Sequence, residues 1–260
     1  MVSLDKLTTN GKALFLAYDQ GLEHGPTDFN DENIDPGYVM KIGVEGKYNA
    51  VIFQKGVADK YYAAAQWAGP IEEYIPLIVK LNGKTSLVTD VEPYSPKLCT
   101  VEEAKELGAM AVGYTMYVGS EFESKMASEL AGVVGAAHEL SMPVLAWMYP
   151  RGKAVDEKFK TPEGKAELTA YAARIGMEIG ADIVKLQYPG SKEALHHAVQ
   201  AAGKTKVVVS GGHKESEEEF LELAKTVVDA GAMGMAVGRN IWQHENPLEL
   251  TKKLKEIIFA

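Results

Sequence analysis

The stretch ADIVKLQYPGS, residues 181–191, combines a short apolar run with a lysine near its end and a Pro-Gly pair directly after it. The run is short and continuously apolar, so it predicts a β-strand buried on both faces. Lys185 lies inside that strand, where removing an ammonium group from water costs several kcal/mol. A strand of this kind fits a parallel sheet covered by helices, and its lysine needs either a partner or a chemical use.

Similar strands recur along the chain, separated by helical patterns. The helices begin at caps such as Thr100 and Ser216, each followed by Glu three residues later, and end at glycines such as Gly180. The predicted strands are residues 13–19, 50–54, 76–82, 111–115, 143–149, 182–188, 206–211 and 234–239. Eight strand–helix units predict the α/β fold called the TIM (β/α)8 barrel, as a single domain over residues 1–260. An open doubly wound sheet is the alternative, but the loop LAYDQGLEHGP (residues 16–26) lacks the G-x-G-x-x-G pattern.

Composition narrows the class of protein. The 260 residues include 27 basic and 36 acidic side chains, a net charge of −9, which argues against binding nucleic acid or anionic membranes. We expect neither a signal peptide nor a membrane span, since no apolar run approaches about 18 residues. The only cysteine, Cys99, allows no intrachain disulfide and favours a reducing, cytoplasmic setting.

Polar residues gather where the predicted strands end, which is the face of a TIM barrel that carries catalytic groups. After the seventh and eighth strands, glycines would let backbone N–H groups approach an anion closely. Arginine suits two-point contacts with phosphate better than lysine does. We therefore expect a phosphate site, although tight turns alone would also explain the glycines. Its residues are Ser210, Gly211, Gly212, Gly238 and Arg239.

Lys185 suggests covalent chemistry. A lysine buried at a barrel mouth has a lowered pKa, so part of it is neutral amine, which attacks carbonyl groups to form a Schiff base. Lys80, in the third-strand stretch IVKLNGK, is a rival for that role. A third interpretation is a structural lysine paired with a barrel carboxylate such as Asp19. The pattern alone leaves all three open.

A Schiff-base enzyme also needs an acid or base. Tyr149 alternates with Trp147 on the fifth predicted strand, so both side chains can face the same interior, where a tyrosine near a lysine shuttles protons. Tyr149 could equally be structural, and Asp19 could simply form a turn. A metal site of His24 with Asp19 or Glu23, plus His213, is the competing chemistry. The sequence contains no H-x-H or H-x-x-x-H pair, so we expect no metal.

Six motifs together resemble the archaeal-type class I fructose-bisphosphate aldolases of the DeoC/FbaB family. They follow the family's order from about residue 13 to 245 and read LAYDQGLEHGP, KLNGKT, WMYPRG, ADIVKLQY, VVVSGG and AVGRNIWQ. The resemblance implies reversible cleavage of fructose 1,6-bisphosphate to dihydroxyacetone phosphate and glyceraldehyde 3-phosphate, in glycolysis or gluconeogenesis. It implies no metal and no other cofactor. It also implies a homo-oligomer, since members often form decamers.

The resemblance assigns the catalytic roles. The family's Schiff-base lysine falls on Lys185, which favours it over Lys80. The acid/base tyrosine falls on Tyr149, and the first-strand aspartate falls on Asp19. The family's phosphate loops fall on the five residues of the expected phosphate site.

The remaining substrate contacts follow from the same resemblance. Trp147 and Arg151 line the family's site, and we expect Arg151 or Lys55 to hold the second phosphate. Two departures are a longer loop at residues 152–165 and Gln20, where some members have His. Two other functions stay open: a related lysine-dependent aldolase or transferase acting on another phosphorylated ketose, and a non-catalytic sugar-phosphate-binding barrel.

Overall fold

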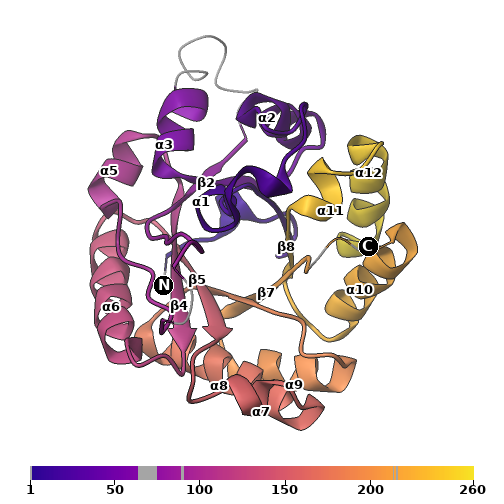
Figure 1. Ribbon diagram of the computed structural model, residues 1–260. Helices are drawn as coiled ribbons and strands as arrows, with labels where there is room; N and C mark the ends of the chain where they lie inside the picture. The colour runs from indigo at the N-terminus through magenta and orange to yellow at the C-terminus, as the bar shows by residue number, and fades with distance from the viewer. Residues whose placement is uncertain (1, 64–74, 89–90, 213, 215) are drawn as a thin grey trace.

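The computed structural model describes residues 2–63, 75–88, 91–212, 214 and 216–260. Eight parallel strands close into a barrel in chain order, and β8 (Gly234–Val237) pairs with β1 (Ala13–Ala17). Helices surround the strands, as Figure 1 shows in a view along the barrel. This confirms the TIM barrel predicted from the sequence.

The other strands alternate with helices along the chain. The strands are β2 Ala50–Gln54, β3 Leu77–Lys80, β4 Ala111–Val118, β5 Val144–Pro150, β6 Ile183–Leu186 and β7 Lys206–Ser210. The longer helices are α2 Pro36–Glu45, α5 Val101–Glu106, α6 Glu123–Glu139, α8 Pro162–Ile179, α9 Lys192–Ala201, α10 Glu217–Asp229 and α12 Pro247–Ile258. The short ones are η1 Asp5–Leu7, α1 Gly21–His24, η2 Gly25–Asp28, α3 Lys55–Val57, η3 Ala58–Ala63, α7 Asp156–Phe159 and α11 Arg239–Trp242. No helix in the described part of the chain is both long and apolar enough to span a membrane.

The helix boundaries follow the expected capping chemistry. Thr100 and Ser216 each accept a hydrogen bond from the backbone N–H three residues on, and the glutamate there accepts one from the backbone N–H of the cap. Gly180 ends α8 in the left-handed conformation at a φ of 105°, which glycine adopts without the penalty of a Cβ. These signals place each helix between two strands and so direct the carboxyl ends of all eight strands to one face.

The barrel interior is apolar below that face. Phe15, Ile52, Leu145 and Ile183 are fully or almost fully buried members of one interior cluster. Leu7 of η1 belongs to the same cluster and packs under the barrel. Because the side chains of this layer are apolar, a charged group above it needs partners at the mouth of the barrel.

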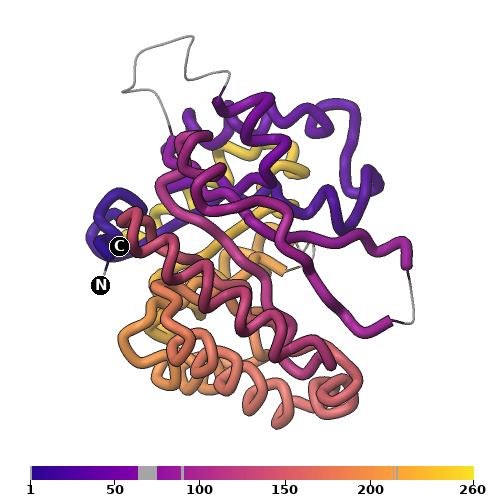
Figure 2. Tube along the Cα trace, turned by 90° about the vertical axis from the view of Figure 1, so that its left-hand side faces the viewer, coloured from indigo at the N-terminus to yellow at the C-terminus, as the bar shows by residue number. Residues whose placement is uncertain are grey.

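The segment between β3 and α5, predicted to be a hairpin or lid, projects at the end of the barrel opposite the two termini (Figure 2). Its described part contains a single antiparallel bridge, between Asn82 and Lys97, rather than a regular hairpin. The Asn82 side chain adds two links, because its amide donates to the carbonyls of Ser95 and Thr115 at 2.9 and 2.8 Å. The segment is therefore held both by contacts within itself and by a contact with β4.

Candidate active site

A cavity of about 910 Å³ lies at the carboxyl ends of the strands. It brings together every predicted site residue except Lys55. Those residues are Asp19, Trp147, Tyr149, Arg151, Lys185, Ser210, Gly211, Gly212, Gly238 and Arg239. Lys80 also lines it.

The indole of Trp147 forms the platform of this cavity. Both buried lysines lie over it, with Nζ of Lys185 5.2 Å and Nζ of Lys80 5.5 Å from the ring centroid. The indole fits because β4 carries Gly113, where an added Cβ would lie 2.2 Å from the ring. A glycine inside a buried strand thus marks the place where the barrel makes room for a functional side chain.

The two lysines share one nearby carboxylate unequally. Asp19 Oδ2 lies 3.1 Å from Nζ of Lys80, whereas Lys185 makes no ion pair with any carboxylate in the described part of the chain. Burial works to raise the pKa of Asp19, but the charges of Lys80 and Lys185 outweigh it and hold that pKa below its ordinary value. The structural lysine considered from the sequence, paired with Asp19, is therefore Lys80.

Lys185 is left with the properties of a nucleophile. Burial lowers its pKa to about 8; the charge of Lys80 acts in the same direction, while Asp19 opposes it. At pH 7 about one tenth of Lys185 is then neutral, against roughly one in three thousand at an ordinary lysine pKa. Neutral amine is the form that attacks a carbonyl.

Tyr149 lies partly buried on β5 and packs against the barrel interior. Its removal from water raises its pKa well above the ordinary value, and the negative charge of Asp19 adds to the effect. The phenol is therefore protonated at neutral pH. It starts any reaction as a proton donor and becomes a strong base once its proton has left.

After β8, the backbone of a glycine comes close to the backbone at the end of β1. A Cβ on Gly238 would lie 2.9 Å from the carbonyl oxygen of Ala17, so only glycine fits there without a shift. Asn240 donates a 2.7 Å hydrogen bond to the carbonyl of Gly211, which ties the two loops together. Arg239 lies beside them, with one nitrogen 3.3 Å from the carbonyl of Gly212. The loops therefore form one glycine-rich wall with a guanidinium at its edge.

Arg151 lies across the cavity from that wall, at the end of β5. Its Nη1 is 3.1 Å from Oε1 of Glu23, and its guanidinium lies 5.1 Å from the ring centroid of Tyr117. Lys84 approaches the same carboxylate at 3.8 Å. The sequence placed Glu23 and Lys84 at strand ends and considered Glu23 as a metal ligand, but it did not predict that Glu23 pairs with Arg151.

Lys55 does not line the cavity that holds the other predicted site residues. Its ammonium forms a short ion pair with Glu103, whose other oxygen accepts the backbone N–H of Thr100 at the start of α5. Because the side chain turns toward α5, it does not line the cavity. The expectation that Lys55 holds a phosphate does not fit this geometry.

In the part of the chain that the structure describes, no three His, Cys, Asp or Glu side chains gather as metal ligands would. His24 bonds instead to Asp28, with Nδ1 2.6 Å from the carboxylate. His213, the other histidine of that alternative, lies outside the described residues.

Comparisons with known proteins agree with this arrangement. The chain is 45% identical to a class 1 fructose-bisphosphate aldolase of Thermoproteus tenax, over 96% of this chain and 90% of that protein. It is 35% identical to a fructose-bisphosphate aldolase/6-deoxy-5-ketofructose 1-phosphate synthase of Methanocaldococcus jannaschii, over 99% and 83%.

A solved archaeal fructose-1,6-bisphosphate aldolase, whose catalytic lysine is covalently bound to the carbinolamine intermediate of its substrate, superposes with a TM-score of 0.88. It is 44% identical to this chain, covering 99% of this chain and 98% of that one. The model of the DeoC/LacD family aldolases matches residues 13–244. With its closed barrel and buried lysines, this chain belongs to the DeoC/LacD aldolase family.

Proposed function

We propose that this protein is a class I fructose-1,6-bisphosphate aldolase that uses Lys185 to form a Schiff base with its substrate. The observation that carries the proposal is the combination of groups at the mouth of the barrel. A buried lysine with its pKa lowered to about 8 lies there, in the same cavity as a glycine-rich wall suited to phosphate. The similarity to archaeal enzymes of that name supports the choice of substrate.

The reaction follows from the roles that we assign. The loops after β7 and β8 bind one phosphate of the open-chain ketose, and neutral Lys185 attacks its carbonyl carbon. Tyr149 donates its proton to the carbinolamine hydroxyl, which leaves as water and gives the iminium. The Tyr149 phenolate then takes the proton of the C4 hydroxyl as the C3–C4 bond breaks. The bond electrons enter the iminium as an enamine, which Tyr149 protonates before water releases the second product.

The other groups bind and orient. Asp19, held by Lys80, orients the reacting amine or a substrate hydroxyl. Arg151 binds the second phosphate, whose remote binding energy positions the reacting carbons. A homo-oligomer is part of the same proposal and rests on the family resemblance, whereas the cytoplasmic setting rests on the single cysteine.

The first prediction concerns turnover. The protein should cleave fructose 1,6-bisphosphate, at a rate that EDTA leaves unchanged, because Lys185 supplies the electron sink that a metal would otherwise provide. A coupled assay for glyceraldehyde 3-phosphate measures this directly. A Schiff-base adduct without cleavage of this bisphosphate would favour another phosphorylated ketose as substrate, and loss of activity in EDTA would contradict the mechanism.

The second prediction concerns Lys80. Lys80→Met removes a cation near Lys185 and frees Asp19 to pair with it, so the pKa of Lys185 should rise. The acid limb of the kcat/KM profile should then move up by about one pH unit, a loss of about tenfold at pH 7 that alkaline pH restores. Lys80→Arg keeps the charge and should keep the limb in place. An equal loss at every pH would mean that Lys80 only supports the fold.

A further inference from the structure

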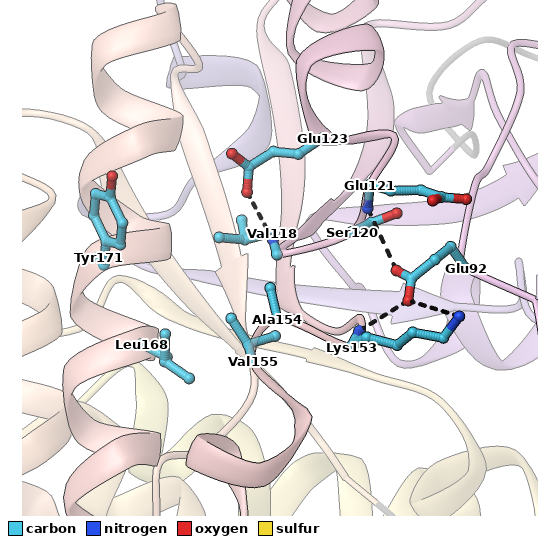
Figure 3. Close-up of a pocket in the computed structure, with 11 residues that line it drawn as sticks. Glu92, Val118, Ser120, Glu121, Glu123, Lys153, Ala154, Val155, Leu168 and Tyr171 are labelled. Atoms are coloured by element: carbon cyan, nitrogen blue, oxygen red, sulfur yellow. Dashed lines mark hydrogen bonds and ion pairs between the residues drawn. The ribbon is translucent and has the colours of Figure 1, made fainter.

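Glu92 is a buried carboxylate outside the barrel, on the segment between β3 and α5. Only 5% of its side chain is exposed. Its two oxygens accept backbone hydrogen bonds from Lys153 at 3.0 Å and from Glu121 at 3.4 Å (Figure 3). The Lys153 ammonium is 3.9 Å away but 81% exposed, so that ion pair adds little. The carboxylate therefore acts mainly as an acceptor shared by two backbone segments.

Those two segments follow neighbouring strands, and their backbones lie close to each other. Glu121 follows β4, and Lys153 follows β5. Between them, a Cβ on Gly152 would lie 2.5 Å from the carbonyl oxygen of Gly119, and Gly152 has a φ of 136°. The two backbones can approach this closely because residue 152 is glycine. Glu92 links the same two segments from the loop after a third strand, beside a cavity of about 500 Å³.

Arg151 is the residue that this arrangement fixes. It immediately precedes Gly152, and its backbone N–H donates to the carbonyl of Val118 at 2.9 Å. Its backbone is thus bound to β4 on one side and, two residues later, to Glu92 on the other. Its side chain donates to Glu23, and both residues line the barrel cavity.

We propose that Glu92 is a positioning residue for Arg151, and that it keeps the guanidinium where the second phosphate of a bisphosphate substrate binds. This inference rests on the proposed function. A guanidinium held in place before binding loses less freedom when phosphate arrives, so affinity and orientation both gain. The effect is specific, because a substrate without the second phosphate makes no use of Arg151.

The test compares two substrates that differ only in that phosphate. Glu92→Gln keeps the shape but puts an N–H₂ group opposite one of the two backbone N–H donors. For fructose 1,6-bisphosphate, kcat/KM should fall about tenfold, mostly through KM. For fructose 1-phosphate it should stay within about twofold. In an Arg151→Met background, Glu92→Gln should add no further loss, since coupled residues are not additive.

The controls separate the possible explanations. Glu121→Gln removes a charge from the wall of the same cavity without removing either backbone hydrogen bond, and should leave both substrates unaffected. If Glu92→Gln does not fold, Ser120→Ala gives a milder test, because Ser120 holds the same segment through a 2.7 Å hydrogen bond to the carbonyl of Pro93. Equal losses on both substrates, or a full loss in the Arg151→Met background, would overturn the inference. A wild-type protein that cleaves neither substrate and forms no adduct would instead overturn the proposed function.

Discussion

Lys185→Met should abolish cleavage of fructose 1,6-bisphosphate, lowering kcat by a factor on the order of 10⁴ or more. Methionine fills nearly the same volume over the Trp147 indole, so the barrel should remain folded. What disappears is the only electron sink in the proposed mechanism, and no step after substrate binding can proceed. Steady-state turnover, with circular dichroism to check the fold, measures the effect.

Lys80→Met is the matched control for this experiment. It removes a lysine that is as buried as Lys185 and lies over the same Trp147 ring. This variant should nevertheless retain substantial turnover at alkaline pH. If Lys185→Met kept activity while Lys80→Met lost it at every pH, the two lysines would have the reverse roles.

Tyr149→Phe should lower kcat by about 10²- to 10⁴-fold, while the protein still accumulates a covalent adduct with dihydroxyacetone phosphate more slowly, because water can replace the phenol as proton donor to the carbinolamine hydroxyl. The substitution removes only the hydroxyl and keeps the ring against the barrel interior. The amine of Lys185 can still attack and the carbinolamine can still lose water slowly, but no side chain in the proposed mechanism remains to take the C4 hydroxyl proton. Turnover and borohydride trapping, measured side by side, separate the two steps.

Tyr188→Phe is the control for the tyrosine, because Tyr188 lines the same cavity but has no role in the proposed mechanism. Its activity should stay within about twofold of the wild type. Full activity of Tyr149→Phe would refute the proton role of Tyr149. Loss of the adduct together with turnover would show that Tyr149 acts in substrate binding or carbinolamine formation.

The fold could be predicted almost completely, because its signals are local and repeat along the chain. Helix caps such as Thr100 and left-handed stops such as Gly180 are set by residues within one turn of them. The segment after β3 was less predictable. Its conformation depends on the side chain of Asn82 reaching across to β4, and no local pattern reveals such a contact.

The sequence allowed us to predict which residues lie at the barrel mouth, but not which of them pair with one another. The position of Lys185 at the end of a strand places it at the barrel mouth, whatever its neighbours are. Which lysine takes Asp19 depends on how side chains from β1, β3 and β6 meet across the interior, which the strand order alone does not specify. The position of Lys55 was unpredictable for the same reason, since its side chain pairs with Glu103, far along the chain, and does not line the cavity.

The central claim is that Lys185 forms the Schiff base, and one measurement tests it most directly. The protein is incubated with dihydroxyacetone phosphate, reduced with borohydride and digested with trypsin, and the modified peptide is identified by mass spectrometry. A modified lysine blocks cleavage, so an adduct on Lys185 gives a peptide of residues 175–192, whereas one on Lys80 gives residues 61–84. We expect the adduct in residues 175–192. An adduct in residues 61–84, or none on a folded protein that binds the ligand, would contradict the account.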